Sequence, residues 1–232
     1  MQSLVLLQRD HEASPRLRAL IDASDRFEVV GLAHTVSDAR TLLRTQRPGI
    51  LMTDLRVQDG DVTGLLQALR RHDGRTRPHV LVTLVSHDDM VLLGALRAGA
   101  DGYWVHASSP DTLVGTLEQL ARGESPMSPL IARQLLHHFD QYDPYNAHTM
   151  SDALNPLVLT GTEREILQWV ARGYLVDEIA QKWHASVHTV ACGIRRVYRK
   201  MHRVAPPGRL SPPAAAGRPG SPGRPGLAGG LM

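Results

Sequence analysis

The sequence has little of what anchors or cross-links secreted and membrane proteins. It contains one cysteine, Cys192, so no internal disulfide can form and a zinc site made only of cysteines is excluded. No apolar run approaches the roughly 18 residues of a membrane-spanning helix. The histidines lack the HExxH spacing of a helical metal site. These absences predict a cytoplasmic protein that has no membrane partner.

Acidic residues are scarce in one segment, and the charge is therefore uneven along the chain. Residues 157–203 hold 8 Lys and Arg against 4 Asp and Glu, whereas residues 1–123 hold 14 against 15. A local basic excess favours contact with phosphates. Double-stranded DNA is therefore expected to meet residues 157–203.

Apolar runs of strand length alternate with amphipathic segments through the first half of the chain. The runs fall at residues 3–7, 27–33, 49–54, 80–85 and 103–105, and helical periodicity follows each one. Such alternation is typical of a doubly wound α/β fold with a five-stranded parallel sheet. We expect this domain to cover residues 1–123.

The third of these runs ends abruptly in a carboxylate, Asp54. A nearly unbroken apolar run indicates a strand that is covered on both faces. In open parallel sheets, ligands bind at the carboxyl ends of the strands. Asp54 is therefore a candidate functional residue, although a solvated aspartate at a strand end would look the same.

Motifs around Asp54 resemble the receiver domain of bacterial two-component response regulators. They are Asp10-His11, Asp54-Leu55-Arg56 and the stretch from His87 to Tyr103. The resemblance implies a flavodoxin-like fold and phosphoryl transfer to Asp54 from a cognate sensor histidine kinase. It also implies Mg²⁺ held by Asp10, Asp54 and the backbone carbonyl of Arg56, with a switch aromatic at Tyr103.

The pocket around Asp54 departs from that family's pattern. Arg9 stands where the family carries a second acidic residue, and His106 stands where it carries a lysine. Val85 occupies the hydroxyl position, with Ser86 next to it. Because Mg²⁺ prefers oxygen ligands, the loss of a carboxylate predicts weakened metal binding.

Three alternatives stay open for this pocket. Asp54 is phosphorylated in the ordinary way, or the pocket binds another ligand, or the Arg9 guanidinium fills the cation site and pairs with Asp54 in a pseudo-receiver. Arginine suits the last alternative because its planar fork matches a carboxylate. Thr83 lies on the same face of the strand as Val85 but roughly 6 to 7 Å back along it, so we expect that Thr83 is not a simple substitute for the missing hydroxyl.

Two segments show no periodicity of a packed domain. Residues 124–156 are expected to form a linker with one short helix over 131–139. Residues 204–232 hold 7 of the 15 prolines and 7 of the 20 glycines. Such a composition buries too little apolar surface to fold, so this segment is expected to be a disordered tail.

Residues 157–203 predict three short helices. Thr160 and Glu163 form a capping box at the first, the second covers about 176–183, and Ser186 caps a third that ends at Met201. A tight turn between the last two indicates a helix-turn-helix, whose third helix would lie in the major groove.

This segment resembles the LuxR-type helix-turn-helix of the NarL/FixJ class of response regulators. The motifs are Glu163-Arg164-Glu165-Ile166-Leu167, Glu178-Ile179-Ala180 and His188-Thr189-Val190. The resemblance implies a homodimeric transcription regulator that is not an enzyme.

Candidate DNA contacts lie on the third helix or just before it. Basic residues there can meet phosphates, which dominate affinity without reading sequence. The candidates are Lys182, Ser186, His188, Thr189, Ala191, Cys192, Arg195, Arg196, Arg199 and Lys200. Ala191, Cys192 and Gly193 depart from the family, and a glycine inside a helix costs about 1 kcal/mol relative to alanine with no evident gain. These departures favour an alternative function, a protein-interaction module whose helix-turn-helix no longer reads DNA.

Overall fold

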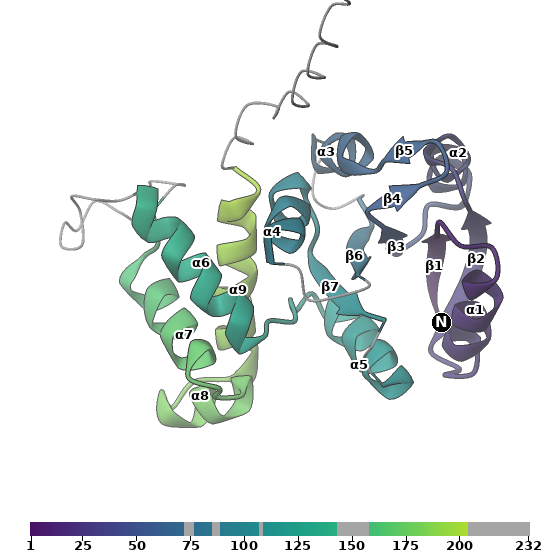
Figure 1. The fold of residues 1–232 in the computed structure, drawn as a ribbon. Coiled ribbons are helices and arrows are strands. Elements are labelled where there is room, and N and C mark those ends of the chain that lie inside the picture. Colours follow the sequence, from purple (N-terminus) through teal and green to yellow (C-terminus); the bar gives the residue numbers. More distant parts are fainter. Residues whose placement is uncertain (72–76, 85–88, 107–108, 143–157, 204–232) are drawn as a thin grey trace, which may run out of the picture.

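The computed structural model describes residues 1–71, 77–84, 89–106, 109–142 and 158–203. A sheet domain, residues 1–127, whose last residues pack on its final helix and strand, is followed by a helical domain, residues 129–203 (Figure 1). None of the helices in the described residues is long and apolar enough to cross a membrane.

Parallel strands form the central sheet of the first domain. They are β1 (Gln2–Leu7), β2 (Phe27–Ala33), β3 (Ile50–Asp54), β6 (His79–Leu84) and β7 (Gly102–Val105), in the order β2-β1-β3-β6-β7. Each neighbouring pair is parallel. The strand order reverses between β1 and β3, which places the ligand crevice of such folds at their carboxyl ends. The predicted doubly wound α/β fold is confirmed.

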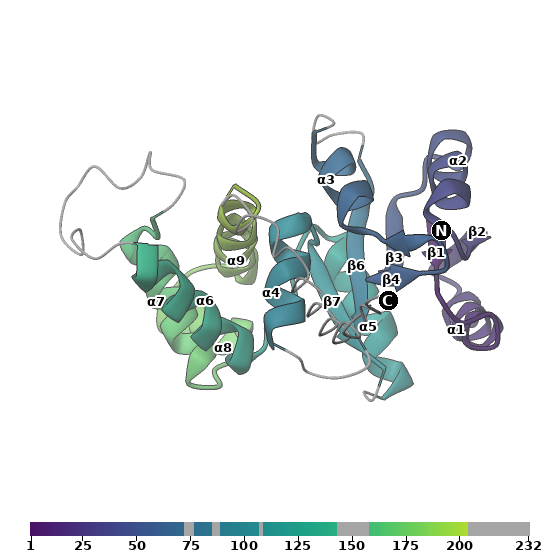
Figure 2. The same cartoon turned by 45° about the horizontal axis from the view of Figure 1, so that its top comes forward.

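Helices cover both faces of the sheet (Figures 1 and 2). The helices α1 (Ala13–Asp22) and α5 (Pro110–Ala121) pack on one face, and α2 (Val36–Gln46), α3 (Thr63–Arg71) and α4 (Asp89–Ala98) pack on the other. Alternate residues of β1 enter the two cores, Leu4 and Leu6 on the α1 side and Val5 and Leu7 on the α2 side. This two-sided burial explains why the strands are apolar without interruption.

A small hairpin follows Asp54 that the sequence did not predict. It consists of β4 (Arg56–Val57) and β5 (Gly60–Asp61), which pair antiparallel. Between them, the Asp59 carboxylate accepts the backbone N–H groups of Val36 at 2.7 Å and Ser37 at 3.2 Å. These bonds at the start of α2 lower the pKa of Asp59 and fix the loop beside the Asp54 pocket.

The helical domain contains α6 (Pro129–Tyr142), α7 (Gly161–Ala171), α8 (Val176–Lys182) and α9 (Val187–Met201). Both predicted caps are confirmed: the hydroxyl of Thr160 accepts the N–H of Glu163 at 3.2 Å, and that of Ser186 accepts the N–H of Thr189 at 3.1 Å. The remaining linker residues and the predicted tail, 143–157 and 204–232, lie outside the described residues.

The helix predicted over 131–139 is longer than expected, because α6 packs along α7. Ile131, Leu135 and Phe139 are buried at helical spacing and form the apolar stripe of α6. The helix is thus a structural layer of the helical domain rather than an isolated turn within a linker.

Gly193 has a packing role that the sequence did not reveal. A β-carbon at this position would lie 2.2 Å from Cδ1 of Ile166 on α7. The glycine therefore permits the close approach of α9 to α7, which offsets its cost in helix propensity.

Candidate functional site

The carboxylate of Asp54 is held by protein groups at the end of β3. Its Oδ2 accepts the backbone N–H of Arg9 at 2.8 Å, and its Oδ1 accepts the Thr83 hydroxyl. His106 Nε2 lies 3.7 Å from Oδ1. The side chain is 20% exposed, so the group is reachable from solvent but its oxygens already have donors.

Thr83 contacts Asp54 directly, through a hydrogen bond that the sequence did not predict. Parallel pairing of β3 with β6 places Thr83 directly beside Asp54. The contact therefore runs across the two strands, and distance along β6 does not limit it. Gln8 orients this hydroxyl by donating from Nε2 at 3.5 Å. Val85 and Ser86 lie outside the described residues.

Arg9 contacts Asp54 only through its backbone. The side chain is exposed, and among the described residues no ion pair joins its guanidinium to Asp54. Arg9 lies two residues after the end of β1, and its N–H donates to Asp54 at the end of β3, at the switch point of the sheet. The guanidinium–carboxylate pair, one of the three alternatives for this pocket, is not formed in this structure, although Arg9 is still part of the pocket through its backbone.

The residues of this pocket fit a magnesium ion poorly. Asp10 Oδ1 accepts the N–H of Glu12 at 2.8 Å, and both oxygens of Asp54 already accept hydrogen bonds. Within the described residues, no group of three or more His, Cys, Asp or Glu side chains could hold a metal ion. Mg²⁺ demands near-octahedral oxygen coordination, and here the carbonyl of Arg56 would join only two carboxylates.

His106 faces the pocket from the end of β7. Its backbone N–H donates to the carbonyl of Leu84 at 2.8 Å, and its ring meets Trp104 edge-on, with centroids 5.1 Å apart. These contacts fix the imidazole near Asp54. The position that the resemblance assigns to a lysine is therefore filled by an imidazole ring.

Tyr103 links the sheet to the segment that enters the helical domain. Its hydroxyl is hydrogen-bonded to Ser128, just before α6, and burial raises its pKa. The side chain also lies near Tyr198 of α9. The predicted switch aromatic therefore touches the boundary between the two domains.

One face of α9 is docked on the sheet domain. Ala191, Arg195, Tyr198 and His202 follow at helical spacing, so they share a face. Tyr198 is fully buried and its hydroxyl donates to the carbonyl of Pro126 at 2.7 Å. His202 Nε2 lies 2.9 Å from the carbonyl oxygen of Ala100. These contacts place α9 beside α4 (Figures 1 and 2).

Two arginines of the sheet domain complete the docking contact. Arg70 of α3 donates to the backbone carbonyl of His202 at the end of α9. Arg97 of α4 contacts His138 of α6, with Nη2 3.0 Å from Nδ1. Burial and the neighbouring guanidinium lower the pKa of His138 to about 4. The imidazole is therefore neutral and accepts from Arg97.

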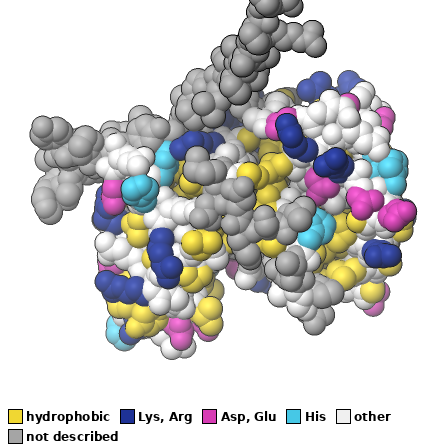
Figure 3. Space-filling model, viewed as in Figure 1, with side chains coloured by type: hydrophobic (Ala, Val, Ile, Leu, Met, Phe, Trp, Pro, Cys, Tyr) yellow, Lys and Arg dark blue, Asp and Glu magenta, His cyan; other side chains and the backbone are white. Residues whose placement is uncertain are grey.

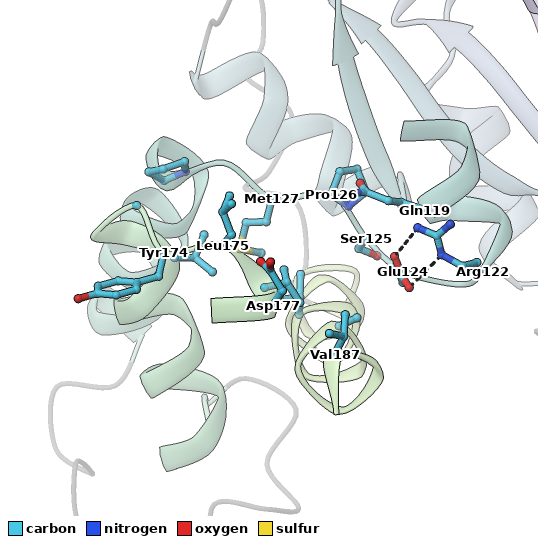
Figure 4. Close-up of a pocket in the computed structure, with 16 residues that line it drawn as sticks. Gln119, Arg122, Glu124, Ser125, Pro126, Met127, Tyr174, Leu175, Asp177 and Val187 are labelled. Atoms are coloured by element: carbon cyan, nitrogen blue, oxygen red, sulfur yellow. Dashed lines mark hydrogen bonds and ion pairs between the residues drawn. The ribbon is translucent and has the colours of Figure 1, made fainter. Parts of the chain in front are cut away.

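A cavity of about 590 Å³ lies between the domains at the start of α9 (Figure 4). On one side are the end of α5 and residues 122–127, where Arg122 pairs with Glu124. The turn from α7 to α8, with Tyr174 and Leu175, forms the other side (Figure 4). Ala191 is 5% exposed and lines this cavity. It cannot reach DNA in this arrangement.

The predicted basic stripe on α9 is divided among three environments. Arg195 lies against Gly123 of the sheet domain. Partial burial, together with the nearby charge of Arg195, lowers the pKa of Arg199. Lys200 is internal: its ammonium pairs with Glu163 at 2.7 Å and donates to the carbonyl of Val158. Lys200 is thus a structural residue, which corrects its assignment as a DNA contact.

The other predicted DNA contacts remain accessible. Arg196, Ser186 and Thr189 are exposed, and His188 Nε2 lies 3.3 Å from Cys192 Sγ one turn later. Lys182 is held over the rings of Trp169 and Tyr174, 5.3 and 5.0 Å from their centroids. Basic side chains are visible over both domains on the face shown in Figure 3.

Both domains have counterparts among known proteins. Residues 157–203 match the family model "Bacterial regulatory proteins, luxR family". A nitrate/nitrite response regulator protein homolog from Haemophilus influenzae is 28% identical over 199 residues, 85% of this chain and 89% of the relative. Oxygen regulatory protein NreC from Staphylococcus carnosus is 26% identical and covers 81% of this chain and 85% of its own. The crystal structure of a LuxR-family two-component response regulator from Aurantimonas sp. is 27% identical, with a TM-score of 0.52 over 57% of this chain and 94% of that chain.

Proposed function

We propose that the chain is a response regulator of the NarL/FixJ class that controls transcription by binding double-stranded DNA through α9. The observation that carries this proposal is the exposed polar and basic edge of α9 within the segment that matches the luxR family model. Ser186, Thr189 and Arg196 lie on this edge. The comparisons support this function over a protein-interaction module without DNA binding.

The docked arrangement of α9 corresponds to a state with low DNA affinity. A recognition helix must enter the major groove, which accommodates one helix but not a helix with another domain packed on it. Tyr198 and His202 attach α9 to the sheet domain. DNA binding therefore requires that these contacts open.

The Asp54 pocket is the proposed input that favours opening. Tyr103 touches both Ser128 and the neighbourhood of Tyr198, so a change at the ends of β6 and β7 can alter the docking of α9. The input is phosphoryl transfer to Asp54 from a sensor kinase, or a change of the hydrogen bonds that hold this carboxylate. Two released copies would pair as a homodimer on a two-fold DNA site.

Weak Mg²⁺ affinity is part of this proposal. The second carboxylate of a metal pocket is replaced by Arg9, and the oxygens of Asp54 are already occupied by Arg9 and Thr83. Arg9→Asp should strengthen Mg²⁺ binding, measured by calorimetric titration of the full chain with Mg²⁺. Arg16→Asp, an exposed change on α1, is the matched control. Equal Mg²⁺ affinity for wild type and Arg9→Asp would contradict this account of the pocket.

The experiment that tests DNA binding is a titration of fluorescent duplex DNA with the full chain at several salt concentrations. Neutralising phosphates releases counterions, so affinity should fall as salt rises. Arg196→Ala should weaken binding and reduce the salt slope by about one. Arg16→Ala should change neither quantity. No binding at low salt, or the same loss with both variants, would overturn the proposed function.

Intact-protein mass after incubation with acetyl phosphate distinguishes the two inputs. An adduct that is absent from Asp54→Asn supports phosphoryl transfer. If no adduct forms while DNA binding persists, the input acts through the hydrogen-bonded carboxylate instead.

A further inference from the structure

A groove between α2 and α3 combines an apolar floor with a basic rim. Its volume is about 510 Å³, within the range of roughly 300 to 1,000 Å³ of small-molecule sites. The floor consists of buried or partly buried apolar side chains, and the rim consists of arginines. The floor residues are Leu43, Leu65, Ala68, Leu69 and Pro78, and the rim residues are Arg40, Arg44 and Arg77.

The rim arginines carry charge that the protein does not fully neutralise. Arg77 is bound to Asp101, with Nη2 2.6 Å from Oδ1, and to the carbonyl of Gly99 at 3.4 Å. Arg40 and Arg44 are exposed, and Arg44 forms no ion pair in the described parts of the chain, whereas the Asp59 carboxylate lies close enough to Arg40 for the guanidinium to contribute to its lowered pKa. Arg40 and Arg44 lie one turn apart, where like charges cost a helix about 0.2 to 0.5 kcal/mol. An anion seated between them would remove this repulsion.

We propose that this groove binds a small amphiphilic anion, a molecule with an apolar body and a carboxylate or phosphate head. The floor suits an acyl or aromatic group, and guanidinium groups bind carboxylate and phosphate through paired N–H donors. A cationic or neutral molecule of the same shape lacks the second interaction. The groove lies apart from the Asp54 pocket and from the cavity beside α9, and shares no lining residue with that cavity.

The same groove is coupled to the docked recognition helix, an inference that rests on the proposed function. Helix α3 supplies Leu65 and Leu69 to the floor and Arg70 to the carbonyl of His202. Arg77 contributes to the rim and also holds Asp101, next to Ala100, which His202 contacts. A ligand that draws Arg77 or α3 towards the groove alters the docking site of α9 and thus DNA affinity.

Calorimetric titration of the full chain with octyl phosphate tests the site. We expect saturable binding at one site, which Arg44→Glu weakens by about tenfold, the value of one charge-assisted contact. Arg16→Glu, an equally exposed reversal on α1, should leave the affinity unchanged. Octanol, octyltrimethylammonium and inorganic phosphate each lack one of the two features and should bind at least tenfold more weakly.

Several outcomes would overturn the site. They are the absence of saturation, equal binding of octyltrimethylammonium, or equal weakening by Arg44→Glu and Arg16→Glu. Sedimentation with phosphatidylglycerol vesicles separates two sources of the ligand. If the chain associates with vesicles and Arg44→Glu abolishes this association, the site is supported and its ligand is a lipid headgroup. If the chain binds octyl phosphate but not vesicles, the site is supported and its ligand is a free molecule.

A DNA titration with saturating octyl phosphate tests the coupling. A shift in DNA affinity that Arg44→Glu abolishes supports the coupling. Unchanged DNA affinity despite ligand binding would overturn the coupling but would leave the binding site itself supported. Failure of the ligand-free chain to bind any duplex would count against the proposed function instead.

Discussion

Removal of one hydroxyl at the domain boundary should release the recognition helix. Tyr198 is buried, and its hydroxyl donates to the carbonyl of Pro126 at 2.7 Å. A hydrogen bond of this kind contributes about 0.5 to 1.5 kcal/mol net. Tyr198→Phe removes it and leaves the Pro126 carbonyl without this donor, while the aromatic ring still fills its place in the interface.

Loss of stability of the docked state should raise the apparent affinity for DNA. When the docked state dominates, the apparent dissociation constant is the intrinsic one divided by the competent fraction. Destabilising the docked state by about 0.5 to 1.5 kcal/mol therefore tightens DNA binding about two- to tenfold. The assay is fluorescence anisotropy of a labelled duplex at fixed low salt, with circular dichroism as the check of folding.

Two comparisons separate release from a direct effect on α9. Tyr174→Phe removes a hydroxyl from a partly buried tyrosine that packs edge-on against Trp169, away from the docking bonds, and should not change affinity. Arg70→Ala loosens the docking from the sheet domain, outside the DNA-binding helix, and should tighten binding as Tyr198→Phe does. Arg71→Ala is its exposed neighbour and control. Unchanged or weaker DNA binding by folded Tyr198→Phe and Arg70→Ala would refute the docking argument.

Three further predictions concern the helical domain. Gly193→Ala should lower the free energy of unfolding in urea by up to about 2 kcal/mol, because overpacking against Ile166 costs about 1 to 3 kcal/mol and the gain in helix propensity returns about 1 kcal/mol. Gly115→Ala on α5, where a new methyl group meets nothing within 4 Å, should raise it by up to about 1 kcal/mol. Glu163→Gln should lower the free energy of unfolding by about 3 kcal/mol, because Lys200 then keeps its charge inside the domain without a carboxylate partner. The measurement is the thermal midpoint, and Glu165→Gln on the exposed face should hardly change it. Equal midpoints for the two variants would contradict the role of the ion pair. The pKa of His138 is about 4 in the folded chain, against 6.5 for a free histidine. The unfolded chain therefore binds the proton at a higher pH than the folded chain, and stability falls as the pH drops from 6.5 towards 4. His138→Gln should flatten this fall in thermal melts, and His137→Gln should not.

The amino-acid sequence by itself determined the elements and their order. Uninterrupted apolar runs such as residues 49–54 fit strands covered on two faces, and helices between successive strands favour a parallel sheet. The caps at Thr160 and Ser186 are local interactions between residues three apart, and both form as predicted. Asp54 was identifiable for the same reason, because a strand end is encoded by neighbouring residues.

Only the tertiary structure decided what touches Asp54 and α9. Thr83 reaches Asp54 through the register of two strands 29 residues apart, and Arg9 reaches it with its N–H because of the direction in which the chain leaves β1. Nothing in the local sequence encodes either contact. Gly193 is another example, since its value depends on how closely α7 approaches.

The docking of α9 shows the same limit on a larger scale. Its spacing of basic residues predicted one DNA-facing stripe, yet Lys200 is paired inside the domain, and Arg195 faces the sheet domain. A helix has several faces, and periodicity assigns residues to a face without saying which surface covers it. Packing between segments far apart in the chain decides which surface covers each face. In this protein, one face of α9 packs on the sheet domain and forms part of the domain interface.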